Sequence, residues 1–360
     1  MADRRNQLTG IKIVIFILIL LLSFSLASQA KTTLKVLNAG SLLVPFTALA
    51  EEFEALNPDI DVLIEGHGSI QVIRHVTEVS QLSGEPIADI VAVADYSLIP
   101  KLMYQTLIPD TQKAYANWLI QFATNSLGIA YTSQSKYANE INGNNWYQIL
   151  SRPDVKLGMS DPRFDACGYR ALMAMQLAEI YYEDDTILQG VMGDFSYPIK
   201  IEAENGQYII LVPEILEPER LAIRDSSIKL LFPLQSGDLD YAFEYKSVAK
   251  QHQMKFIEFP EELNLGTKGY EELCQDIRVK LAFRRFASVN PDFNIQPIIY
   301  GMTIPANAPH PEYALKLLQF MLSPKGQEIM QQNHQLTIRP AIGHNWADIP
   351  DVLKNDLVKE

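Results

Sequence analysis

The sequence predicts an α/β protein with two compact lobes. Strand-like and helix-like patterns alternate along the chain, which is typical of sheets whose strands run largely parallel. A length of 360 residues with 48% hydrophobic side chains is enough for two such lobes. Sheets of this kind bind ligands beyond the carboxyl ends of their strands, where loops meet helix amino termini. We therefore expect the functional residues in those loops.

Residues 1–30 have the pattern of a cleavable secretory signal peptide. Basic residues precede an apolar run at 13–22, and the segment ends with Ser28-Gln29-Ala30. The alternative is an uncleaved amino-terminal anchor, but the run is shorter than the roughly 20 residues that a spanning helix needs. No Cys follows the run, so a lipid anchor on a new amino-terminal Cys is not indicated. We expect a protein exported to the periplasm or the extracellular space.

The first lobe is expected over 31–117, completed by 300–345. Strands are predicted at 34–37, at 60–64, where apolar residues alternate, and at 90–94, which reads as a buried strand; a turn and then a helix follow the first two. These repeated units predict a sheet whose neighbouring strands run parallel.

The second lobe is expected over 118–299. It contains a predicted helix at 169–181, and an alternating pattern near 195–213 that is broken by Asn205-Gly206. Asn-Gly between alternating apolar residues is a strong signal for a β-hairpin, which we expect to decorate this lobe.

The chain is expected to return to the first lobe near its end. An apolar strand is predicted at 297–301, and an amphipathic helix at 311–330. We expect the strand to cross back between the lobes and complete the first sheet.

Two serines follow predicted strands in glycine-containing turns. Ser41 comes directly after Gly40, and Ser69 directly after Gly68. Glycine lets the backbone approach a ligand closely, and unpaired N–H groups at a helix start favour an anion. The alternative is that both serines are helix N-caps. Their equivalent positions in one lobe favour an anion site.

Enzyme motifs are absent from the sequence. It has no Gly-x-Ser-x-Gly elbow, His-Glu-x-x-His pair, Walker loop or Gly-x-Gly-x-x-Gly. His67 lies near Ser69 in the sequence, but proximity along the chain does not make a catalytic pair. A periplasmic serine-dependent enzyme stays a minor alternative, and we expect no enzyme activity.

Charge and cysteine content limit the partners. The net charge of −13 argues against nucleic acid, although local N–H and hydroxyl groups can still hold a small anion. Cys167 and Cys274 are not part of a CxxC pair, so a thiolate metal site is not expected. Whether the two cysteines form a disulfide is left open. We expect no cofactor.

Four stretches of the sequence resemble one known family. They are Asn38-Ala39-Gly40-Ser41-Leu42, Ala94 to Met103, Asp161 to Arg170, and Ser236 to His252. Together they are similar to the archaeal type of tungstate/molybdate-binding protein, over about 34–338. This resemblance implies a type II periplasmic-binding-protein fold with the ligand cleft between the lobes. It also implies a monomer that binds a small oxyanion and delivers it to the permease of an ABC transporter.

The resemblance also implies roles for individual residues. Ser41, beside Gly40, and Ser69 match serines that donate hydrogen bonds to the oxyanion from the first lobe. Asp165 matches an aspartate that approaches the W or Mo atom of the oxyanion, and Tyr245 matches a tyrosine that contacts the ligand from the second lobe.

The sequence departs from the family pattern at Ser227. The family has a glutamate there, as a second carboxylate ligand, so hydroxyl hydrogen bonding by Ser227 is expected to replace it. Ala166 also stands where a proline is usual. Asp225 is a possible substitute carboxylate, whereas Glu244 is either a ligand or a hinge or surface residue. Because of Ser227, sulfate or phosphate is the alternative ligand.

Overall fold

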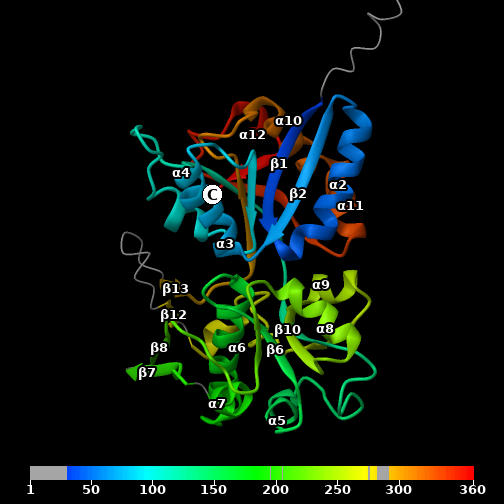
Figure 1. The fold of residues 1–360 in the computed structure, drawn as a ribbon, viewed down its shortest axis with the longest axis vertical. Coiled ribbons are helices and arrows are strands. Elements are labelled where there is room, and N and C mark those ends of the chain that lie inside the picture. The colour runs from blue at the N-terminus through cyan, green and yellow to red at the C-terminus, as the bar shows by residue number, and fades with distance from the viewer. Residues whose placement is uncertain (1–30, 195, 205, 275, 282–291) are drawn as a thin grey trace, which may run out of the picture.

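The structure is a computed structural model that describes residues 31–360, except 195, 205, 275 and 282–291. The expected signal peptide at 1–30 lies outside the described residues. Two lobes are stacked along the long axis of the molecule, as Figure 1 shows. Each lobe has its own sheet with helices packed around it, which confirms the predicted two-lobed α/β fold.

The first lobe is built on a seven-stranded sheet. Its strands, in spatial order, are β16 (Leu357–Lys359), β15 (Leu336–His344), β4 (Leu119–Thr124), β14 (Ile299–Thr303), β3 (Ile90–Val93), β1 (Thr32–Ala39) and β2 (Ile60–His67). The interior strand β3 consists of Ile, Val and Ala and is fully buried, as expected for a strand covered on both faces.

The strands of this sheet are less parallel than the sequence pattern predicted. β1 runs parallel to both β2 and β3, as expected. β14, however, runs antiparallel to β3 and β4, and β15 runs antiparallel to β4. β4 and β14 are the segments next to the crossings between lobes, so their direction follows from the route of the chain. The pairing of β14 with β3 and β4 confirms that the strand expected at 297–301 completes the first sheet.

Helices cover both faces of the first sheet (Figure 1). They include α2 (Leu43–Leu56), α3 (Ser69–Arg74), α4 (Ser80–Ser83), α10 (Pro311–Leu322), α11 (Pro324–Gln332) and α12 (Asp351–Lys354). The prediction of one continuous helix over 311–330 is wrong, because α10 ends before Ser323 and α11 begins after it. Ser323 caps α11 by accepting a hydrogen bond from Gly326 N, and Pro324 has no N–H with which to continue α10.

The second lobe has a five-stranded sheet of β11 (Lys255–Glu258), β5 (Leu127–Tyr131), β10 (Tyr241–Tyr245), β6 (Leu157–Ser160) and β9 (Ala222–Arg224). Its helices include α5 (Trp146–Leu150), α6 (Ala166–Tyr182), α7 (Ile187–Met192), α8 (Leu231–Ser236) and α9 (Lys246–Gln251). The buried helix α6 corresponds to the helix predicted at 169–181 and packs against β6 and β10.

The predicted hairpin is part of a separate four-stranded sheet. β7 (Lys200–Glu204) pairs antiparallel with β8 (Gln207–Val212), which confirms the hairpin. β8 also pairs parallel with β12 (Ile277–Leu281), and β12 pairs with β13 (Asp292–Asn294). The hairpin is therefore anchored by distant strands.

The chain crosses between the lobes at Asn125 and Ser126. β4 belongs to the first sheet and β5 to the second, so these two residues form one link, and the chain returns to the first sheet between β13 and β14. The boundary expected at 117/118 falls before β4, and the structure instead assigns that strand to the first lobe. The carboxyl-terminal strand β16 also belongs to the first sheet.

Among the described residues, no helix is long and apolar enough to cross a membrane. Cys167 and Cys274 are both buried free thiols, so the structure contains no disulfide between them.

Candidate functional site

The predicted site residues lie where loops of the two lobes face each other. From the first lobe come Gly40 and Ser41 after β1, and Ser69 after β2. The second lobe contributes Asp165 at the start of α6, Ser227 after β9, and Tyr245 at the end of β10. All six are buried. The fold therefore brings together residues that are far apart in the sequence.

The lobes touch at the two glycine turns. A Cβ atom added to Gly68 would lie 2.4 Å from the carbonyl oxygen of Phe164 and 2.6 Å from that of Asp225. A Cβ atom at Gly40 would lie 2.8 Å from Ser226 Oγ. No side chain fits these gaps, so glycine is needed for the lobes to approach this closely.

The start of α3 contributes to the same contact. The N–H groups of Ile70 and Gln71 both donate to the Phe164 carbonyl oxygen, at 3.0 and 3.2 Å. These N–H groups were expected to favour an anion, and in this closed arrangement they bind a carbonyl of the other lobe instead.

Asp165 is a buried carboxylate held by backbone donors. Its Oδ2 accepts from Ser227 N at 2.9 Å, and its Oδ1 accepts from Cys167 N at 3.4 Å as the N-cap of α6. Burial raises the pKa of Asp165, while hydrogen bonds from the N–H groups of Ser227, Cys167 and Ser69 oppose that rise. Because Ser69 belongs to the first lobe, Asp165 links the two lobes.

Ser227 connects Asp165 to a second buried carboxyl group. The Ser227 hydroxyl donates to Glu244 Oε1 at 3.0 Å, and Tyr245 N donates to the same oxygen at 2.8 Å. Burial raises the pKa of Glu244 to about 8, and the nearby Asp165 adds to the rise. Glu244 is only 1% exposed, so it lies inside the site and is not a surface residue.

Asp225 was a possible substitute carboxylate, and the structure places it at the surface. Its carboxylate pairs with Lys229 one helical turn away, with N–O distances of 2.7 and 2.8 Å. Of the two acidic residues considered beside Asp165, Glu244 is therefore the one that lies in the site.

The hydroxyl groups of Ser69 and Tyr245 each accept a hydrogen bond from the protein. Ser69 Oγ accepts from Ala94 N at 3.0 Å. Tyr245 OH accepts from Arg170 Nη1 at 2.9 Å. A hydroxyl has one hydrogen, and an oxygen that already accepts from the protein is left with that hydrogen to donate. Both groups are thus arranged as donors, which suits an oxyanion.

Arg170 and Asp95 are functional candidates that were missed from the sequence. Arg170 on α6 donates to Ala94 O at 2.7 Å, and its Nη2 lies 3.6 Å from Asp95 Oδ2. Asp95 also accepts from Tyr169 OH at 2.6 Å and from Gln296 Nε2 at 2.7 Å. These bonds join α6 of the second lobe to the end of β3 in the first.

A signal for Arg170 was present in the sequence. It is the one charged residue between Ala166 and Met175, in an otherwise apolar stretch of helix. A buried arginine needs a carboxylate or several carbonyl partners, so a paired position could have been predicted.

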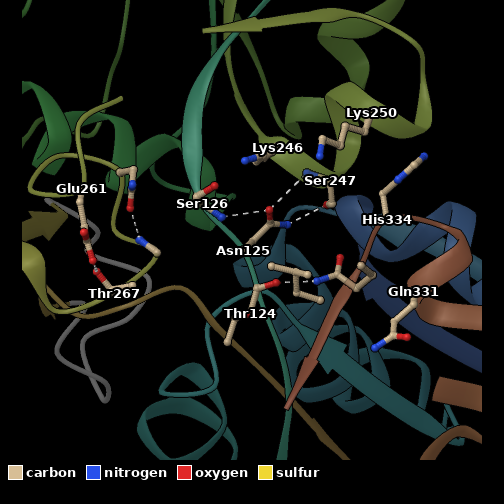
Figure 2. Close-up of a pocket in the computed structure, with 14 residues that line it drawn as sticks. Thr124, Asn125, Ser126, Lys246, Ser247, Lys250, Glu261, Thr267, Gln331 and His334 are labelled. Atoms are coloured by element: carbon tan, nitrogen blue, oxygen red, sulfur yellow. Dashed lines mark hydrogen bonds between the residues drawn. The ribbon is translucent and has the colours of Figure 1, made fainter. Parts of the chain in front are cut away.

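A separate cavity of about 640 Å³ lies beside the crossing between the lobes (Figure 2). Its walls include Thr124, Asn125 and Ser126 of the crossing, Lys246 and Ser247 of α9, and Gln335. The predicted site residues are not among those that line it, but Asn125 connects the two places. Asn125 Nδ2 donates to Tyr300 OH, which lies 2.9 Å from Ser41 Oγ.

Other chemistry has less support in the described part of the chain. His67 lies against His75 and is 3.8 Å from Glu65, while the Ser69 hydroxyl bonds to Ala94. Among the contacts of the described residues there is no hydrogen bond between the side chains of His67 and Ser69. Within residues 31–360, apart from the undescribed positions, no group of three or more His, Cys, Asp or Glu side chains is arranged to hold a metal ion.

Sequence comparison relates this chain to solute-binding proteins. Residues 34–334 match a family described as "Bacterial extracellular solute-binding protein". The chain is 37% identical over 337 residues to the molybdate/tungstate-binding protein WtpA of Pyrococcus abyssi, covering 91% of this chain and 90% of that protein. It is 36% identical over 338 residues to the protein of the same name from Thermococcus kodakarensis, with coverage of 91% and 88%. An uncharacterized solute-binding protein of Methanoculleus marisnigri is 39% identical over 323 residues, covering 89% and 86%.

Solved structures share the fold at low sequence identity. The periplasmic molybdate-binding protein of Azotobacter vinelandii superposes with a TM-score of 0.52 at 15% identity, covering 84% of this chain and 98% of that one. The sulfate-binding protein SubI of Mycobacterium tuberculosis also gives 0.52, at 14% identity, with coverage of 86% and 88%. These similarities confirm the periplasmic-binding-protein fold.

Proposed function

The chain belongs to the bacterial extracellular solute-binding protein family, and we propose that it captures tungstate or molybdate and delivers it to an ABC transporter. Relatives that are 36% and 37% identical over about 90% of their length carry the name molybdate/tungstate-binding protein. Membership of this family implies an exported protein.

One arrangement supports the proposal: both lobes contribute buried hydroxyl donors at the contact between them, where the buried carboxylate of Asp165 also lies. Ser69 and Tyr245 accept from the protein and so keep their hydrogens for a ligand. Hydroxyl and backbone donors hold a small dianion locally, and the net charge of −13 does not prevent this.

The carboxylate of Asp165 is the reason to propose a metal oxyanion. A carboxylate beside a dianion is repulsive unless its oxygen enters the coordination shell of the central atom. W(VI) and Mo(VI) are large enough to accept further oxygen ligands, whereas the sulfur of sulfate is not. Asp165 therefore favours tungstate and molybdate and opposes sulfate.

Sulfate or phosphate is the second candidate, and Ser227 is the observation that favours it. The family resemblance implies a glutamate at this position, where this chain has Ser227, so the site is expected to have one carboxylate fewer there. Its hydroxyl binds Glu244 instead, which leaves two acidic groups near the ligand. Hydrogen phosphate has a proton for which the Asp165 carboxylate can accept a hydrogen bond, and sulfate at neutral pH has none.

The test is a panel of four anions at neutral pH: tungstate, molybdate, sulfate and phosphate. A ligand at 1000 times its dissociation constant stabilises the folded state by about 4 kcal/mol, which raises the melting temperature visibly. We expect shifts with tungstate and molybdate, and a smaller shift or none with sulfate. A shift with sulfate or phosphate alone would contradict the metal-oxyanion assignment, and no shift with any of the four would contradict oxyanion binding.

We further propose that the protein acts as a monomer without a resident cofactor and that its closed form is recognised by the permease. Closure around the ligand presents loops of both lobes on one surface, which gives the permease a means to distinguish loaded from empty protein.

A further inference from the structure

We propose that Asn125, at the crossing between the lobes, fixes the Ser41 hydroxyl as a hydrogen-bond donor to the bound anion, acting through Tyr300. This makes Asn125 a positioning residue that does not itself touch the ligand. The inference rests on the proposed function, because it assumes an oxyanion at Ser41. It extends that function by making the direction of the Ser41 hydroxyl depend on the crossing between the lobes.

The orientation of the Asn125 amide follows from its neighbours. The backbone N–H groups of Ser126 and Ser247 both point at one end of the amide, at 3.0 and 3.3 Å. N–H groups can face only the amide oxygen, so the other end is the NH₂ group. Figure 2 shows Asn125 held between these two residues.

The NH₂ group has two hydrogens, and each has a partner. One is donated to Ser247 Oγ at 2.7 Å and the other to Tyr300 OH at 2.9 Å. Asn125 is only 5% exposed, so water does not compete freely for these bonds. Tyr300 therefore accepts a hydrogen bond from Asn125 at the crossing between the lobes.

The hydrogen bond from Asn125 determines the direction of the hydrogen bond between Tyr300 and Ser41. Its oxygen accepts from Asn125, so its own hydrogen is directed to Ser41 Oγ, 2.9 Å away. Burial raises the pKa of Tyr300, which keeps the phenol protonated and able to donate. Ser41 Oγ then accepts from Tyr300, and its hydrogen is left for the ligand.

The hydrogen bonds from Asn125 to Tyr300 and from Tyr300 to Ser41 form a relay. This relay gives Ser41 the same arrangement that Ser69 and Tyr245 have. Each of these hydroxyls accepts from a fixed protein donor and has its hydrogen available. The donor for Ser41 differs because it starts at the link between β4 and β5. Asn125 is held by Ser126 of the crossing and by Ser247 of the second lobe, while Tyr300 belongs to the first lobe. The relay is therefore complete only when the crossing keeps this geometry.

The test is Asn125→Asp, which keeps the shape of the side chain but replaces the NH₂ donor with an acceptor. The introduced carboxylate should accept the Tyr300 hydrogen, so that Tyr300 accepts from Ser41 and the Ser41 hydrogen turns away from the anion. Calorimetry with tungstate should show binding at least about 10-fold weaker than in the parent. An unchanged affinity would overturn the proposal.

A double-mutant cycle with Tyr300→Phe separates the relay from a general effect of charge or hinge strain. Without the phenol, Ser41 is free to rotate and can still donate, so Tyr300→Phe alone should weaken binding by only about 3-fold. Adding Asn125→Asp to Tyr300→Phe should then cost less than about 3-fold more. An equal loss from Asn125→Asp in both backgrounds would overturn the proposal.

Asn264→Asp is the matched control. It places the same charge in the wall of the same cavity, where Asn264 Oδ1 accepts from Gly266 N, a bond that the substitution retains. We expect a change in tungstate affinity below about 2-fold. A loss as large as that of Asn125→Asp would assign the effect to charge and overturn the relay.

The parent protein distinguishes failure of the relay from failure of the proposed function. If the parent binds only sulfate or phosphate, the metal-oxyanion assignment fails, and the same cycle run with that anion still decides the relay. If the parent binds none of the four anions, both proposals fail.

Discussion

Asp165 combines a structural and a proposed ligand role in one side chain. Its carboxylate accepts backbone hydrogen bonds from Ser227 and Cys167, which explains how a charged group is accommodated at 5% exposure. The proposed role is coordination of the W or Mo atom. Substitution should therefore affect stability and selectivity in different ways.

Asp165→Ala should weaken tungstate and molybdate by about 100-fold or more, and leave sulfate equal or better. The reason is that the metal oxyanions lose a coordinating oxygen, whereas sulfate loses a repulsive neighbour. Dissociation constants from calorimetry with the three anions provide the measurement. Unpaired N–H groups of Ser227 and Cys167 should also lower the free energy of unfolding by about 1–3 kcal/mol.

Asp225→Ala is the control for this substitution, since it removes a carboxylate paired with Lys229 at the surface. It should leave all three affinities unchanged. Equal weakening of all three anions by Asp165→Ala would show that Asp165 is only structural.

At the scale of secondary structure, the site depends on α6 and the end of β3. Arg170 of α6 donates to Ala94 O, and Ala94 N donates to Ser69 Oγ, so one residue of the first lobe connects the second lobe to a site serine. Arg170 also holds Tyr245 OH. The buried Arg170–Asp95 pair therefore stabilises the closed arrangement as well as orienting two donors.

Asp95→Asn should weaken binding of tungstate, molybdate and sulfate by a similar factor of about 10. The substitution removes the charge that compensates Arg170 across the lobes, and this raises the cost of closure whatever the ligand. Calorimetry with the three anions measures it, and Asp61→Asn, at an exposed pair with Lys31, is the control. A loss confined to the metal oxyanions would argue against a role in closure.

These elements also show what the sequence could predict. Ser41 and Ser69 were found because a strand, a glycine turn and a helix start are local patterns. The break between α10 and α11 was also local, in Ser323-Pro324, and was overlooked. The pairing of Arg170 with Ala94 and Asp95 depends on how two lobes meet, so periodicity carries no information about it. The same holds for Ser227 and Glu244, whose contact depends on the register of β9, β6 and β10.

At the scale of the whole molecule, the amino terminus of the exported protein can be predicted. Because the chain belongs to an extracellular solute-binding family, we predict that the mature protein starts at Lys31, after Ser28-Gln29-Ala30. Intact-mass spectrometry of the protein recovered from the periplasm or medium should give the mass of residues 31–360. A mass that includes residues 1–30 would favour the uncleaved anchor.

The described lobes are in contact, and their closure is the movement that ligand binding should control. Ser41 and Ser69 belong to one lobe and Asp165 and Tyr245 to the other, so an anion that contacts both favours the closed state by its differential affinity. The radius of gyration from small-angle scattering should therefore fall when tungstate is added to the parent. An unchanged radius at saturation would contradict closure.

Gly68→Ala provides the sharpest test of this movement. The backbone of Gly68 has φ −63° and ψ 142°, which alanine adopts without strain, so the separated lobes should fold normally. In the closed state the added Cβ atom would lie 2.4 Å from the Phe164 carbonyl oxygen of the other lobe. The lobes must then stay apart by more than the site tolerates, and we expect tungstate affinity to fall by about 100-fold. The melting temperature without ligand should stay close to that of the parent, while the radius of gyration should no longer fall with tungstate.

Ser236→Ala, on the exposed surface, is a suitable control. Gly84→Ala is a poor one, because the φ of +73° at that turn strains any residue other than glycine. Full tungstate affinity and normal compaction in Gly68→Ala would mean that the ligand is bound without this contact between the lobes, and the site would then have to be assigned to a more open arrangement.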